Sequence, residues 1–220
     1  TVSTLLASKA LGDEEQYDTY IGFILGTGLN CAYSEHNDRI GKLSSTPLGE
    51  TQIINTEIGG YEGYTGGEVD DEFDAATKSP GHYRMEKMVS GAYLGPLGGT
   101  LLRRAALDGL FSDETARALE SMGELHTIEM DAFLRRPYGA RSTTSDRATS
   151  DGSSSNRSTS DRATSERTDP EDERQNPLAE FCYSHEDRIV AHTLLDNLVE
   201  RAGKLAALNM TAAVLRSDAG

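Results

Sequence analysis

The chain has 220 residues, enough to bury one sizeable hydrophobic core. Its 36 aspartates and glutamates outnumber its 21 lysines and arginines, so the formal net charge at pH 7 is -15. Such a charge repels nucleic acid phosphates and anionic lipid surfaces, so we expect neither nucleic acid nor membrane as a partner.

The cysteine content and the apolar runs indicate the cell compartment. Cys31 and Cys182 lie far apart in the sequence without metal-like spacing, so we expect two reduced thiols and no metal site. No apolar run approaches the ~18 residues of a membrane span, and the first residues lack the charged and apolar regions of a signal peptide. We therefore expect a cytoplasmic protein; the sequence leaves its oligomeric state unknown.

Three β-favouring segments precede the first helical pattern. Residues 20–25 end at Gly26-Thr27-Gly28, and residues 30–33 can return as a second strand, which predicts a hairpin with a glycine-rich tip. A third strand is expected over residues 52–57, before the turn at Gly59-Gly60. On this pattern, strands open the chain.

An acidic run follows these strands. Its members are Glu68, Asp70, Asp71, Glu72 and Asp74. The run lacks the alternating ligands and central glycine of a calcium-binding EF-hand loop. We therefore expect a solvated loop here.

Helical spacing dominates the rest of the chain. Apolar residues recur at helical intervals over residues 83–110, which predicts two helices broken around Gly91. Ser112 and Asp113 offer an N-cap for a helix that ends near Met122. The apolar pattern of residues 185–216 predicts one long helix or two shorter ones that pack back on the core.

A low-complexity stretch interrupts this pattern over residues 142–176. It consists mainly of serine, threonine, aspartate, arginine, glutamate and glycine. Such a composition buries too little apolar surface to offset the entropy lost on ordering, which predicts a disordered insertion in a surface loop. The expected organisation is a domain over residues 1–141, this insertion, and a helical continuation of the same domain over residues 177–220.

Several polar residues near these turns are candidates for binding. The backbone amides of Gly26-Thr27-Gly28 could converge on a phosphate, with the Thr27 hydroxyl beside them, although any hairpin can use such glycines. Asn30 and Glu57 could hydrogen-bond a polyol, or could be an ordinary turn residue and a solvated strand end. Glu86, taken alone, is equally well explained as a solvated helix charge.

Five short segments, taken in order, resemble the large domain of eukaryotic-type hexokinases, a family that includes the glucokinases. They are TVSTLLA at residues 1–7, IGFILGTGLNCAY at 21–33, NTE at 55–57, DEFD at 71–74 and EKMVSGAYLG at 86–95. The resemblance is close up to about residue 111 and weaker beyond it.

This resemblance implies an α/β fold of the actin-like ATPase (ribonuclease H-like) type, in which the chain forms part of a large domain with a mixed sheet flanked by helices. It implies an ATP-dependent, magnesium-using hexose kinase that turns a hexose such as glucose into its 6-phosphate. Asn30, Glu57 and Glu86 match hexose-binding positions. Gly26, Thr27 and Gly28 match the turn that approaches the nucleotide phosphates.

The catalytic residue is not assigned in this chain. In the family, the aspartate base immediately precedes the segment that matches residues 1–7, so we expect it just before Thr1. The first phosphate loop and the adenine-binding segment of the family are also unmatched. We therefore expect the 220-residue piece, by itself, to transfer no phosphate.

Three other functions are compatible with the sequence. A regulatory hexokinase relative could keep the sugar-binding residues without catalysis. A glycoside hydrolase could use Glu57 and Glu86 as its carboxylate pair, although the ordered segments argue against it. A folded interaction domain with a disordered insertion is the least specific interpretation.

Overall fold

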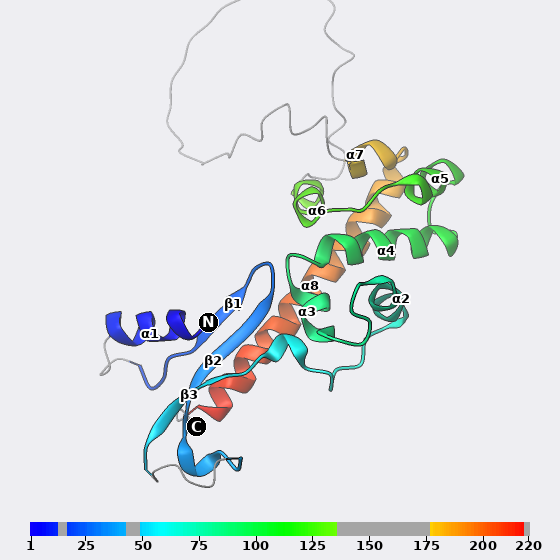
Figure 1. The fold of residues 1–220 in the computed structure, drawn as a ribbon. Coiled ribbons are helices and arrows are strands. Elements are labelled where there is room, and N and C mark those ends of the chain that lie inside the picture. The colour runs from blue at the N-terminus through cyan, green and yellow to red at the C-terminus, as the bar shows by residue number, and fades with distance from the viewer. Residues whose placement is uncertain (13–16, 43–48, 136–176, 218–220) are drawn as a thin grey trace, which may run out of the picture.

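The computed structural model describes residues 1–12, 17–42, 49–135 and 177–217 (Figure 1). The predicted insertion at residues 142–176 lies outside these ranges. The elements in chain order are α1 (Val2–Leu11), β1 (Gly22–Leu25), β2 (Leu29–His36), η1 (Asn37–Arg39), β3 (Thr51–Asn55), η2 (Ile58–Gly60), α2 (Glu68–Ala76), α3 (Arg84–Val89), α4 (Leu94–Leu107), α5 (Asp113–Ser121), α6 (Thr127–Leu134), α7 (Pro177–Phe181) and α8 (His185–Arg216).

The three predicted strands form one antiparallel sheet in the order β1-β2-β3. The predicted hairpin is confirmed, because Leu25 pairs with Leu29 across the glycine-rich turn. β3 then pairs with the second half of β2, with Asn55 opposite Ala32. This register places the turn after β3 beside the start of β2.

The chain does not open with a strand, as the sequence pattern predicted, but with the helix α1. One side chain of α1, Leu5, is fully buried. The helix lies against β1, where an added Cβ at Gly22 would be only 2.5 Å from the carbonyl oxygen of Thr1. Packing on the sheet stabilises α1, and its weak apolar periodicity gave no sign of this.

The predicted helices are confirmed, with a break between α3 and α4 around Gly91. The Ser112 side chain caps α5 by accepting a hydrogen bond from the Thr115 amide. Of the two alternatives for the last segment, the structure shows a single continuous helix of 32 residues, α8.

Helix α8 extends from the small helices α5–α7 at one end of the molecule to the strands at the other (Figure 1). Near its start it joins a core formed with α4, α5, α6 and α7, and towards its end it packs on α3 and β2. Its contributions to the four apolar clusters are, in chain order, Ala191 and Leu195, Leu198, Leu205 and Ala206, and Ala213. The sheet and the small helices are therefore held by one common element.

The acidic run is not a solvated loop, and that prediction was wrong. It forms α2, in which Asp70 and Asp74 are only 5% and 7% exposed. Asp70 binds both terminal nitrogens of Arg201 on α8 at 2.8 Å, and Asp74 binds Lys87 on α3 at 2.5 Å. Partners this far along the chain leave no signal in the local sequence.

No helix among the described residues is both long and apolar enough to cross a membrane.

Candidate functional site

Asn30 lies at the start of β2 and ties this strand to the segment that follows β3. Its Oδ1 accepts hydrogen bonds from the backbone amides of Cys31, at 2.8 Å, and Glu57, at 3.1 Å. Its Nδ2 donates to Oε1 of Glu57 at 3.0 Å. One amide side chain therefore holds both the backbone and the carboxylate of Glu57.

Glu57 is one of two non-glycine residues with positive φ among the described residues, at φ 50° and ψ 39°. A left-handed conformation costs a non-glycine residue about 1–3 kcal/mol and is often found in binding sites. The carboxylate is exposed, and Asn55 also donates to its Oε1. Within the described residues, both side-chain hydrogen bonds to Glu57 reach Oε1, which leaves Oε2 to accept from a ligand.

Glu86 approaches the same place from α3. Its Oε2 accepts a hydrogen bond at 3.0 Å from the amide of Leu29, the residue before Asn30. An added Cβ at Gly28 would lie 2.7 Å from that oxygen, and one at Gly59 would lie 3.1 Å from it. The two glycines make room for the carboxylate, so the three predicted hexose-binding residues converge at the start of β2.

The predicted phosphate-approaching turn lies at the tip of the hairpin. Thr27 is exposed, and an added Cβ at Gly26 would meet no atom within 4 Å, so a ligand can come close to this backbone. The Gly26 carbonyl accepts from the Gly91 amide at 2.7 Å. Gly28 differs from Gly26 because it faces Glu86 and not open space.

Two residues that belong to this arrangement were not predicted as site residues. Asn55 donates to the Glu57 carboxylate, and its spacing of two residues from Glu57 at a strand end was an available signal. Gly91, in the break between α3 and α4, donates to the Gly26 carbonyl in the glycine-rich turn of the hairpin, and only the tertiary structure shows this contact.

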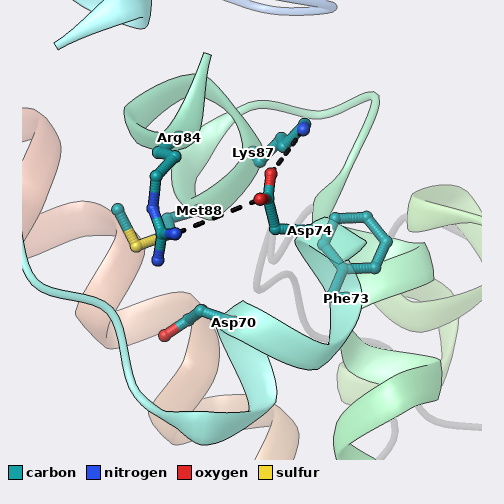
Figure 2. Close-up of a pocket in the computed structure, with 6 residues that line it drawn as sticks. All are labelled: Asp70, Phe73, Asp74, Arg84, Lys87 and Met88. Carbon is teal, nitrogen blue, oxygen red and sulfur yellow. Dashed lines mark hydrogen bonds and ion pairs between the residues drawn. The ribbon is translucent and has the colours of Figure 1, made fainter. Parts of the chain in front are cut away.

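A small hollow lies between α2 and α3 (Figure 2). It has a volume of about 10 Å³, room for at most one water molecule. The polar groups around it are hydrogen-bonded within the chain: Asp74 accepts from Lys87 and from the Gly81 amide. Burial works to raise the pKa of Asp74, but these hydrogen bonds and the nearby Arg84 outweigh it, so its pKa is lowered. This hollow is not a substrate site.

Metal ligands do not cluster in the described part of the chain: no three His, Cys, Asp or Glu side chains lie close enough together to hold an ion.

A family model described as hexokinase matches residues 20–219. The chain belongs to the hexokinase family. Hexokinase-9 of rice is 36% identical over 134 residues, which are 59% of this chain and 26% of that protein. The Hexokinase-like 1 protein of Arabidopsis thaliana is 43% identical over 93 residues, 42% of this chain and 18% of that protein. The chain thus spans about a quarter or less of these hexokinase relatives.

A solved hexokinase from Schistosoma mansoni, complexed with glucose, resembles the structure with a TM-score of 0.67 at 21% identity. The match covers 97% of this chain and 43% of that one. The predicted actin-like ATPase fold is therefore confirmed for the described part of the chain. The three strands that the structure describes form an antiparallel sheet, whereas a mixed sheet was expected.

Proposed function

We propose that this chain forms the sugar-binding part of an ATP-dependent hexose kinase, which transfers the terminal phosphoryl group of ATP to a hexose such as glucose. One observation carries the proposal: Asn30, Glu57 and Glu86, which come from three separate segments, converge at the start of β2. Family membership supports the same reaction.

These three groups suit the recognition of a polyol. Each carboxylate can accept hydrogen bonds from hydroxyl groups. The Oδ1 of Asn30 is occupied by two backbone amides, but its Nδ2 donates to Glu57 through one hydrogen and can donate the other to a sugar. Hydrogen bonds to charged groups contribute about 1.5–3 kcal/mol each. A sugar that lacks one of the bound hydroxyls leaves a polar group unpaired, so such a site discriminates strongly between sugars.

The hairpin tip suits the approach of a phosphate chain. Gly26 leaves its backbone accessible, and Thr27 offers an exposed hydroxyl. We propose that magnesium enters with the phosphate groups of ATP, because this ion usually binds through substrate phosphates and few protein ligands. There it would neutralise phosphate charge, while the hairpin holds the sugar beside the nucleotide.

We place the general base immediately before Thr1, as the resemblance to hexokinases implies. The start of α1 packs against β1 at Gly22, in the same hairpin that carries Asn30, and this supports the placement. A base at that point would be close to the hairpin and could take the proton of the attacking hydroxyl. The 220-residue piece alone is still predicted to be inactive, and the cytoplasmic location stays a prediction.

The test uses the full-length parent protein with magnesium and ATP, and glucose, mannose and fructose as substrates. We expect turnover on at least one hexose, and a loss of at least about 100-fold in kcat/KM for Glu57→Gln. Glu62→Gln, the same substitution at a nearby exposed glutamate, is the control and should keep full activity.

The outcomes separate the candidate functions. Glucose binding without turnover on any hexose would favour the regulatory relative over the kinase. Turnover that survives Glu57→Gln would remove Glu57 from the sugar site while leaving the kinase activity established.

A further inference from the structure

The position of Glu86 is defined within narrow limits. Its carboxylate lies between Gly28 and Gly59, where an added Cβ would come within 2.7 Å and 3.1 Å of Oε2, and it accepts from the Leu29 amide at 3.0 Å. A small shift of α3 would break this hydrogen bond or press the carboxylate into the hairpin. The proposed sugar site therefore depends on what holds α3.

Helix α3 is short and has no side-chain cap at its N-terminus. It has six residues, and its N-cap, Tyr83, takes the left-handed conformation and makes no capping hydrogen bond through its side chain. An isolated helix of this length is unstable in water, so contacts outside the helix must set its position.

Lys87, the residue next to Glu86, provides such a contact on the side facing α2 (Figure 2). It is 2% exposed, and its ammonium donates to Asp74 Oδ1 at 2.5 Å, Thr77 Oγ1 at 2.7 Å and the Ser79 carbonyl at 2.6 Å. An ammonium has three donors, so all are in use and none remains for a ligand. The same carboxylate of Asp74 also accepts from the Gly81 amide, which fixes the loop leading into α3.

We propose that Lys87 is a positioning residue for hexose binding: it fastens α3 to α2 so that Glu86 is held between Gly28 and Gly59. This inference rests on the proposed sugar site. Adjacent residues on a helix point in directions about 100° apart. Lys87 and Glu86 can therefore attach the same short helix to two different neighbours, α2 and the hairpin.

The test measures glucose binding to the full-length protein by calorimetry, together with KM and kcat. For Lys87→Met we expect the Kd and KM of glucose to rise about tenfold or more, with a smaller fall in kcat. Lys87→Arg keeps the charge but cannot reproduce three converging hydrogen bonds, so a smaller rise is expected. This second variant also serves if Lys87→Met does not fold.

The matched control is Arg201→Met, which breaks the ion pair between α8 and Asp70 of α2 but leaves the contact between Lys87 and Asp74 in place. We expect it to destabilise the protein while changing the Kd of glucose by less than about twofold. In a double variant with Glu86→Gln, Lys87→Met should add less than about twofold to the loss, because both changes act on the same contact.

Equal effects of Lys87→Met and Arg201→Met on the Kd of glucose would overturn the inference. A double variant whose rise in Kd equals the product of the rises for Glu86→Gln and Lys87→Met would overturn it as well. Unchanged binding in Glu86→Gln would overturn both the inference and the sugar site. Normal glucose binding without phosphoryl transfer in the parent protein would refute only the kinase proposal, since the calorimetric test of Lys87 does not need turnover.

Discussion

The two ends of α8 support regions that use polar residues in opposite ways. At its start, Asp187 is 3% exposed and accepts from the Ser112 amide and from the hydroxyls of Ser112 and Thr115. At its end, α8 packs against β2, whose Asn30 holds the exposed Glu57 that follows β3.

The difference lies in how completely the polar groups are used. Asp187 joins the first turns of α5 and α8 and has its hydrogen-bonding capacity filled from within the chain, so it specifies structure. Glu57 accepts the hydrogen bonds of Asn30 and Asn55 through Oε1 while Oε2 can accept from a ligand, which suits the proposed role in sugar recognition. Changes in the first region should therefore lower stability, and changes in the second should lower hexose affinity.

The largest expected effect on stability comes from Asp187→Ala. It removes the acceptor of three hydrogen bonds, from the buried Thr115 hydroxyl and from the amide and hydroxyl of the more exposed Ser112, so the free energy of unfolding should fall by about 3 kcal/mol. Asp196→Ala, at an exposed position of the same helix, should change it by less than about 0.5 kcal/mol. Denaturant titration of the full-length protein measures both. If the folded Asp187→Ala protein bound glucose much more weakly, the two regions would not be independent.

Acid should weaken the first region through the same carboxylate. Burial works to raise the pKa of Asp187, but hydrogen bonds from Ser112, Thr115 and Ser184 outweigh it and lower this pKa from 3.8 to about 2. Because the folded pKa is depressed, the carboxylate contributes about 2 kcal/mol above pH 4, and this is lost as the pH falls towards 2. Unfolding titrations between pH 5 and 2 should show the loss, and Asp187→Asn should remove this part of the pH dependence.

Two neighbouring glycines test the second region. In Gly59→Ala, the new methyl group would lie 2.9 Å from the Leu29 carbonyl and 3.1 Å from the Glu86 carboxylate. We expect a loss of about 1–2 kcal/mol in stability and about tenfold in glucose affinity. In Gly60→Ala the methyl group meets no atom within 4 Å, so stability and affinity should stay nearly unchanged. Equal behaviour of the two variants would contradict the tight fit around Glu86.

The smallest expected effect is a difference between the alkylation rates of Cys31 and Cys182 in the unmodified protein. Both thiols are 1% exposed. Burial raises the pKa of Cys31. Burial and, to a lesser extent, the charge of Asp187 raise the pKa of Cys182 to about 12. Each should react with an alkylating reagent only after local opening. Saturating glucose should slow labelling of Cys31, beside Asn30, by about tenfold and leave Cys182 almost unaffected. Mass spectrometry of labelled peptides would measure both rates, and equal protection of the two would show that the regions open together.

Much of the secondary structure could be predicted because its signals are local. The glycine break before Leu29, the Ser112 cap and the apolar period of α8 all act over a few residues. The order of short segments also identified the family. Each candidate sugar-binding residue was found in this way, although none could be distinguished from an ordinary polar residue by its local surroundings.

Tertiary structure decided which partners those residues have. Asn30 meets Glu57 across 27 positions, Leu29 meets Glu86 across 57, and Asp70 meets Arg201 across 131. The burial of α2 and the packing of α1 on the sheet depend on such distant partners, which explains why both were missed. The sequence by itself determined the three strands, several of the helices, the family and the candidate residues. Only the folded chain decided which carboxylates are paired in the interior and which stay exposed, because pairing and desolvation depend on neighbours that are brought together by folding.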